Sequence, residues 1–319
     1  MTAGAGAGGM RRLRLGTRKS PLALAQSGLV ARALEAAHPG LAVELVPIVT
    51  QGDRLPGDLN LVGGKGLFTA ELEAGLLDGT LDLAVHSLKD LPVRSAEGLV
   101  VAAYPERADP RDVLVSAVAT RVAELPRGAR VLTGSLRRQA QLRALRPDLE
   151  PVSVRGNVET RLRKWRESGA AATVLAAAGL ARLGLAEDEA LRASLHPLAA
   201  EELLPAPGQG ILAVQVRRGS EAETLCRALD HGPTRAAAAA ERAVVTAFGG
   251  DCTLPLAAWA RFVDGGLALS ALLAAPDGSE VLRAEASGAD GESVANECVE
   301  RLRTLGADAL LARLHSAVR

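Results

Sequence analysis

The stretch RLRLGTRKSPLALAQSGLVARALEAA, residues 12–37, combines a short strand pattern with a longer helical pattern, and a turn separates the two. Apolar and polar residues alternate over 12–16, whereas apolar residues recur at helical spacing from Pro21 onward. Strand and helix patterns continue to alternate at 43–49, 67–79, 81–85 and 99–104. Alternation of this kind predicts a largely parallel sheet that is covered by helices.

A second unit repeats the pattern after ERADPRD (106–112), which we interpret as a crossing between two lobes. Its strand candidates lie at 112–116, 130–135, 151–157 and 171–179, and a helical pattern follows each of the last three. ELLPAPGQG (202–210) is interpreted as a second crossing. ILAVQVRR (211–218) then predicts a strand that returns to the first sheet.

The last part of the chain changes character. Residues 256–288 hold three strand-like runs joined by DGG (264–266) and PDGS (276–279), which are hairpin turn signals and predict an antiparallel sheet. One C-terminal helix, about 291–314, is expected to cover it. We therefore predict an α/β protein with a disordered tail (1–10) and three domains: 11–105 plus 211–228, 106–204, and 232–319.

Composition excludes several classes of protein. The 319 residues carry no net charge and only 2% aromatic residues, which argues against a nucleic-acid-binding surface. The N-terminus lacks an apolar signal region, and no stretch approaches the roughly 18 apolar residues of a membrane span. Three scattered cysteines without a CxxC motif argue against disulfides and a zinc site. We expect a cytoplasmic protein without a bound metal.

The cysteines differ in their surroundings. Cys226 and Cys298 lie in helical patterns and are expected to be core residues. Cys252, in the turn GGDCTLP (249–255), has no such pattern. Cys252 could be a small turn residue packed in the core or a reactive thiol. Only a thiolate is strongly nucleophilic, and the neighbouring Asp251 would oppose its formation, so both interpretations remain open here.

The region from 127 to 166 is strongly basic, with eleven Lys or Arg against three acids. A solvated helix face accounts for Arg143, Arg146, Arg163 and Arg166. TGSLRR and VRGN, in contrast, each join a strand to a helix, where free backbone N–H groups and the helix dipole favour an anion. We expect Ser135 to cap its helix, and Arg137, Arg138 and Arg155 to bind a polyanionic ligand.

Similar junctions occur in the first unit. GTRKSP places Arg18 at a helix start, and VGGKGLF (62–68) contains Lys65 but departs from a P-loop. HSLKDLP (86–92) follows a buried strand and places Lys89 and Asp90 at the sheet edge. An alternative for the last motif is a capping box formed by Ser87 and Asp90. If it is functional, Asp90 could stabilise a positive charge that develops on a substrate.

These motifs together resemble the hydroxymethylbilane synthases, also called porphobilinogen deaminases, from about residue 11 to about residue 315. The resemblance rests on LGTRKSPLALAQ, VTQGD, VGGKGLF, VHSLKDLP, ERADPRD, TGSLRRQAQL, RGNVETRL, LAAAGLARLGL, LPAPGQG and GGDCTLP. It implies two lobes like type-II periplasmic binding proteins, with a cleft between them, and a third domain that presents a cysteine. It also implies a monomer that condenses four porphobilinogen molecules head to tail with loss of ammonia. Hydrolysis then releases linear hydroxymethylbilane.

The resemblance assigns roles to single residues. Cys252 would carry a dipyrromethane cofactor through a thioether, Asp90 would be the catalytic carboxylate, and Phe68 would stack on a pyrrole. Side-chain carboxylates of cofactor and substrate would be held by Arg18, Lys65, Ser87, Lys89, Ser135, Arg137, Arg138, Arg155, Arg161 and Arg182. Leu61, where relatives often have lysine, and Asp251, where they often have glycine, depart from the family pattern.

Two other functions compete with this interpretation. A two-lobed receptor that binds an anion without catalysis would use the same cleft, but it does not account for a third domain with a turn cysteine. A nucleic-acid-binding protein would use the basic 127–166 region, but the neutral net charge and the few aromatic residues argue against it.

Overall fold

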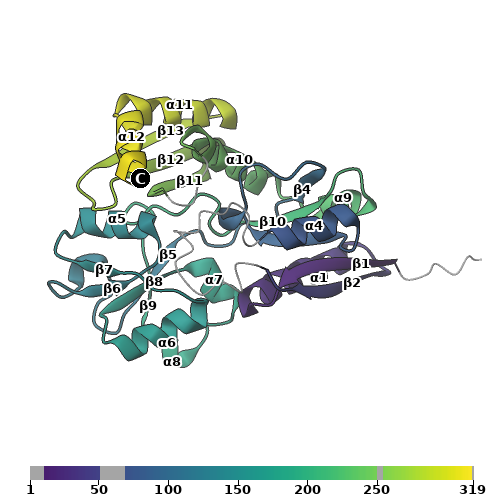
Figure 1. Ribbon diagram of the computed structural model, residues 1–319, viewed down its shortest axis with the longest axis horizontal. Coiled ribbons are helices and arrows are strands. Elements are labelled where there is room, and N and C mark those ends of the chain that lie inside the picture. Colours follow the sequence, from purple (N-terminus) through teal and green to yellow (C-terminus); the bar gives the residue numbers. More distant parts are fainter. Residues whose placement is uncertain (1–10, 51–68, 250–253, 318–319) are drawn as a thin grey trace, which may run out of the picture.

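Two five-stranded sheets and one three-stranded sheet organise the protein in the computed structural model, which describes residues 11–50, 69–249 and 254–317 (Figure 1). The expected disordered tail, 1–10, lies outside the described residues. The fold class is as expected: two α/β lobes and a C-terminal domain with an antiparallel sheet. No helix in the described ranges is both long and apolar enough to cross a membrane.

The first lobe is built on a sheet with the order β2-β1-β3-β10-β4. Its strands are β1 (Arg11–Arg18), β2 (Leu41–Ile48), β3 (Leu83–Ser87), β4 (Leu99–Ala103) and β10 (Leu212–Arg217). Strand β10 lies antiparallel between β3 and β4, which confirms that the chain returns to the first sheet. Helices α1 (Pro21–Ala37) and α9 (Glu221–Cys226) cover one face, and α4 (Ala70–Asp78) covers the other. The inner strands β3 and β10 are mostly apolar because both of their faces are buried.

The second lobe repeats this arrangement in the order β7-β6-β8-β5-β9. Its strands are β5 (Asp112–Val115), β6 (Arg130–Leu132), β7 (Glu150–Val152), β8 (Ala172–Ala176) and β9 (Leu195–Pro197), and its helices are α5 (Leu136–Leu145), α6 (Val158–Ser168), α7 (Ala177–Arg182) and α8 (Glu189–Arg192). In each lobe, one strand runs against the other four, and that strand is the first after a crossing: β5 in the second lobe and β10 in the first.

The C-terminal domain consists of a sheet with helices on one face. It contains α10 (Gly232–Ala247), β11 (Leu256–Val263), β12 (Gly266–Ala274), β13 (Val281–Gly288), α11 (Gly291–Thr304) and α12 (Ala307–Ala317). The expectation of a single C-terminal helix was wrong, because Gly306, with φ +105°, separates α11 from α12. On the other face of the sheet, Ala257 and Leu272 pack against Ala140 of α5, so this domain also touches the second lobe (Figure 1).

Candidate functional site

The predicted site residues that the structure describes all lie at the carboxyl ends of parallel strands or in the helices that follow them. In the first lobe, Arg18 ends β1, Ser87 ends β3, and Lys89 and Asp90 form the next turn. In the second lobe, the residues are Ser135, Arg137 and Arg138 at the start of α5, Arg155 after β7, Arg161 in α6, and Arg182 in α7. Ligands of open α/β sheets bind at these strand ends.

The turn after β3 presents Asp90 to solvent. Residues Leu88–Asp90 form one 3₁₀ turn, and the backbone N–H of Leu91 closes it on Leu88. Ser87 makes no side-chain cap bond to this turn; its hydroxyl instead accepts a hydrogen bond from Gln26 Nε2 at 3.0 Å. The capping-box alternative for Ser87 and Asp90 was therefore wrong, and α1 holds the end of β3 through Gln26.

Lys89 points toward the crossing between the lobes rather than into bulk solvent. Its Nζ donates a hydrogen bond to Gln209 Oε1 at 3.3 Å. Burial lowers the pKa of Lys89 to about 8, although the neighbouring Asp90 acts in the opposite direction. Because the ammonium is removed from water, Lys89 loses its proton more readily than an exposed lysine does.

Arg137 and Arg138 share one buried carboxylate, that of Asp112 at the start of β5. Arg137 Nη2 lies 2.8 Å from Asp112 Oδ2, and Arg138 Nη2 lies 2.7 Å from Asp112 Oδ1. Burial alone would raise the pKa of the Asp112 carboxyl, but the two guanidinium groups outweigh this effect and hold it well below its usual range. We call Asp112, Arg137 and Arg138 the arginine–aspartate cluster. The hydroxyl of Ser135 caps α5, as expected, by accepting from the backbone N–H of Arg138.

The arginine–aspartate cluster carries one more positive charge than negative. Both arginines are at most 5% exposed, and the Nε atoms of Arg137 and Arg138 have no hydrogen-bond partner among the described residues. A buried, uncompensated cation is costly, as is a buried donor without an acceptor. The cluster therefore favours a ligand that brings carboxylates, because such a ligand would supply both the missing charge and the missing acceptors.

Arg161 connects the two lobes electrostatically. Its Nε donates to Gly156 O at 2.8 Å, at the N-terminal end of α6. Burial lowers the pKa of Arg161; Arg138 and Arg155 act in the same direction, whereas Asp90 of the first lobe opposes them. The carboxylate of Asp90 therefore lies within electrostatic reach of Arg161 in the second lobe.

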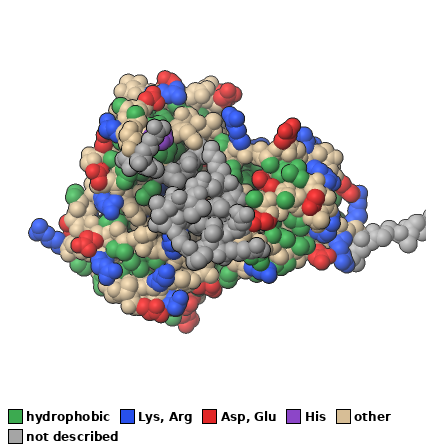
Figure 2. Space-filling view, viewed as in Figure 1, with side chains coloured by type: hydrophobic (Ala, Val, Ile, Leu, Met, Phe, Trp, Pro, Cys, Tyr) green, Lys and Arg blue, Asp and Glu red, His purple; other side chains and the backbone are tan. Residues whose placement is uncertain are grey.

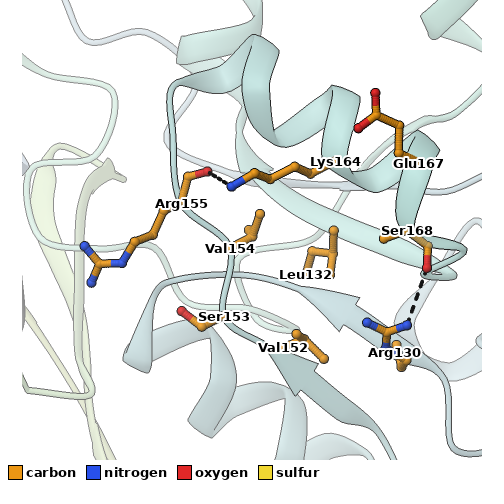
Figure 3. Close-up of a pocket in the computed structure, with 9 residues that line it drawn as sticks. All are labelled: Arg130, Leu132, Val152, Ser153, Val154, Arg155, Lys164, Glu167 and Ser168. Carbon is orange, nitrogen blue, oxygen red and sulfur yellow. Dashed lines mark hydrogen bonds between the residues drawn. The ribbon is translucent and has the colours of Figure 1, made fainter. Parts of the chain in front are cut away.

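The remaining predicted cations in the described residues are Arg182, Arg18 and Arg155. Arg182 Nη2 donates to Gly210 O of the second crossing at 2.7 Å, and burial lowers the pKa of Arg182 to about 10. Burial also lowers the pKa of His86, just before Ser87, to about 4, and the charge of Arg18 adds to this effect. Arg155 lies next to a pocket beside α6, and Figure 3 shows its guanidinium pointing away from that pocket. Lys164 of α6 donates a hydrogen bond to the Arg155 carbonyl at 3.1 Å.

Three predicted residues, Lys65, Phe68 and Cys252, lie outside the described residues, as do the departures at Leu61 and Asp251. The other two cysteines are core residues, as expected. Cys226 and Cys298 are both fully buried, and burial raises the pKa of their thiols to about 12 and about 11. Neither thiol is placed for nucleophilic chemistry.

Sequence reasoning missed three residues that hold the site together: Gln26, Asp112 and Gln209. Asp112 had a signal, since it is an acid at the start of the otherwise apolar strand DVLV. Gln209 lies in the quoted motif LPAPGQG, but nothing in that motif shows what its amide contacts. Gln26 lies within a helix pattern and gave no signal of its own.

The face of the molecule shown in Figure 2 carries no large patch of one charge among its described residues. In Figure 2, Lys and Arg side chains alternate with Asp and Glu side chains over the described part of the face that is shown. Within the described ranges, no group of three or more His, Cys, Asp or Glu side chains is placed to hold a metal ion.

Two family models match the chain. Residues 13–224 match "Porphobilinogen deaminase, dipyromethane cofactor binding domain", and residues 236–304 match "Porphobilinogen deaminase, C-terminal domain". Among solved structures, the VFT2 domain of Bordetella pertussis BvgS (a double mutant) is similar over 68% of this chain and 86% of its own, with 16% identity and a TM-score of 0.40.

Similar sequences cover nearly the whole chain. The porphobilinogen deaminase of Xanthomonas oryzae pv. oryzae is 49% identical over 310 residues, which are 96% of this chain and all of the relative. That of Chromobacterium violaceum is 46% identical over 307 residues, or 95% of this chain and 98% of the relative. On these matches, the chain belongs to the porphobilinogen deaminase family.

Proposed function

We propose that Asp90 is the catalytic carboxylate of this transferase, and that cations from both lobes hold the carboxylates of its cofactor and of the growing product. The reaction is the family's: four porphobilinogen molecules are joined head to tail with loss of ammonia, and linear hydroxymethylbilane is released. The observation that carries the proposal is the position of Asp90, which lies in the turn that follows β3, within electrostatic reach of Arg161 in the other lobe.

The site fits a dipyrromethane. Each of its two pyrroles bears an acetate and a propionate, so the group brings several carboxylates. The arginine–aspartate cluster has an excess positive charge and two buried Nε donors with no described partner. Arg137, Arg138 and Lys89 would hold these carboxylates, with Arg18, Ser87, Ser135, Arg155, Arg161 and Arg182 placed around them. When bound, the dipyrromethane supplies the pyrrole carbon to which the first substrate unit is joined.

Asp90 has two tasks in this proposal. Its carboxylate accepts hydrogen bonds from the pyrrole N–H groups of the substrate and so orients the ring. It also stabilises the positive charge that develops on the substrate as ammonia departs, because a fixed anion beside a delocalised cation acts without reorganisation. Lys89 and Arg161 both lie within electrostatic reach of this carboxylate.

Cys252 is proposed as the attachment point, with Lys65 as a further cation and Phe68 as a stacking partner for a pyrrole. The two other cysteines support this choice, because both are buried in helices and have raised thiol pKa values. We also propose that the enzyme acts as a monomer in the cytoplasm, without a membrane, nucleic acid or metal. The neutral net charge supports the absence of a nucleic-acid or membrane partner, and the scattered cysteines support a reducing compartment and the absence of a metal site.

Intact-protein mass tests the attachment. Protein made in cells that supply porphobilinogen should weigh more than its sequence by one dipyrromethane, and the added mass should map to the peptide that contains Cys252. Cys252→Ser should lose both the added mass and activity, whereas Cys298→Ala should keep them. An active protein that carries no added mass would overturn the role given to Cys252.

A further inference from the structure

Gln209 lies fully buried where the two crossings between the lobes run side by side. Its backbone carbonyl accepts a hydrogen bond from Arg107 Nε of the first crossing at 2.9 Å. Its side-chain Nε2 donates to the carbonyl of Pro110, also in the first crossing, at 2.7 Å. Gln209 thus ties the second crossing to the first.

The same amide also reaches into both lobes. Its Nε2 donates to Asp112 Oδ1 of the second lobe at 2.8 Å, and its Oε1 accepts from Lys89 Nζ of the first lobe at 3.3 Å. The partners fix the orientation of the amide, because two acceptors face its nitrogen and a donor faces its oxygen. A reversed amide would set like groups against each other on both sides.

We propose that Gln209 is a positioning residue that joins Lys89 to the arginine–aspartate cluster, so that cations of both lobes are held on one ligand. Lys89 is the neighbour of Asp90, and Asp112 is the shared partner of Arg137 and Arg138. One continuous chain of hydrogen bonds therefore runs from the turn that contains Lys89 and Asp90, in the first lobe, to the arginine–aspartate cluster of the second lobe. The inference rests on the proposed function, in which these cations bind the same carboxylate-bearing ligand.

The link has a consequence for the charge of Lys89. Among the residues that the structure describes, the charged groups that act on its ammonium include Asp90, Arg138, Asp112 and Arg137. Gln209 is neutral, but its oxygen accepts a hydrogen bond from the ammonium and so favours the protonated form. Removal of this acceptor should make Lys89 easier to deprotonate.

The chain is suited to a direct measurement because it contains only four lysines, Lys19, Lys65, Lys89 and Lys164. Protein labelled with ¹³C at lysine Cε should give four signals, and the signal that Lys89→Arg removes belongs to Lys89. In the wild type that signal should titrate near pH 8. In Gln209→Met its midpoint should fall by about one pH unit, the shift expected for one lost hydrogen bond to a charged group.

Gln141→Met is the matched control. Gln141 is also buried and bonds to the second crossing, through the backbone of Leu204, but it has no bond to Lys89. Its substitution should leave the Lys89 titration in place. The basic limb of kcat/KM, which reports the free enzyme, should move with the NMR midpoint in Gln209→Met and stay fixed in Gln141→Met.

A folded Gln209→Met protein in which Lys89 titrates as in the wild type would overturn the inference, and so would an equal shift in Gln141→Met. The two proposals can fail separately. If the Lys89 midpoint shifts only in Gln209→Met, the link between Gln209 and Lys89 stands. If, in addition, neither the wild type nor any variant consumes porphobilinogen, the proposed function fails. Should Gln209→Met not fold, Gln209→Asn takes its place, because the shorter side chain cannot span Asp112 and Lys89.

Discussion

Arg107 and Glu241 form a buried ion pair that joins the first crossing to the C-terminal domain, with Arg107 Nη1 2.6 Å from Glu241 Oε1. The same carboxylate accepts hydrogen bonds from the backbone N–H of Gly208, in the second crossing, at 2.6 Å, and from that of Ala260, in β11, at 2.7 Å. One side chain therefore fixes the C-terminal domain to both connections between the lobes.

Replacing Glu241 should destabilise the whole protein. In Glu241→Gln, the amide nitrogen would face a donor, and Arg107 would lose its counter-charge in a buried place. Loss of one partner from a buried ion pair costs about 3–5 kcal/mol. The free energy of unfolding in urea should fall by about that amount, whereas Glu280→Gln, which breaks an exposed pair with Arg313, should cost less than about 1 kcal/mol. Equal losses in the two variants would contradict the role given to Glu241.

The two crossings approach so closely that one position between them requires glycine. Gly210 has φ +87°, and a Cβ atom there would lie 2.4 Å from the carbonyl oxygen of Ala108. Gly219 is a matched control, since it has φ +73° but open space around its Cβ position. Gly219→Ala should cost about 1–2 kcal/mol of backbone strain. Gly210→Ala should cost clearly more in the same urea experiment, and an equal cost would show that the crossings can move apart.

Local signals explain why much of the fold could be predicted. Helices α5 and α6 begin and end where the sequence indicated, because Ser135 and Asn157 cap their first turns and Gly169, with φ +66°, ends α6. Gly306 also carries a stop signal, but the apolar pattern continues past it, so two helices were predicted as one. The antiparallel direction of β5 has no local signal, because it depends on pairing with β8 and β9, which lie much later in the chain.

The sequence predicts at which strand–helix junctions the cations of the candidate site lie, but it does not predict the residues that hold them in place. Arg137 and Arg138 stand out at a strand–helix junction, whereas their partner Asp112 lies about 25 residues earlier and Gln209 lies 97 residues beyond Asp112. Contacts at such separations are set by the packing of the lobes. The sequence therefore indicates which charges a ligand would meet, but not the network that orients them.

The charge of Asp112 should be visible in the dependence of stability on pH. The folded protein holds the pKa of this carboxyl below its ordinary value, so its contribution to stability is present above about pH 4 and is lost as the pH falls below that value. Asp112→Asn should lower the free energy of unfolding at pH 7 by about 3–5 kcal/mol. It should also flatten the loss of stability below pH 4. If the variant and the wild type lose stability in parallel on acidification, the low pKa of Asp112 is wrong.

Asp90→Asn should separate binding from turnover. Asparagine keeps the size of the side chain and one acceptor, but it removes the fixed negative charge beside the departing ammonia. Loss of such an electrostatic group typically lowers kcat by about 100- to 1000-fold. Ammonia release under steady-state conditions should show a loss of at least this size, while intact-protein mass should still show added substrate units or the cofactor. Glu97→Gln, at an exposed position of the same lobe, should keep wild-type turnover. A kcat for Asp90→Asn within tenfold of the wild type would remove Asp90 from its catalytic role, because the arginines alone cannot stabilise a developing cation.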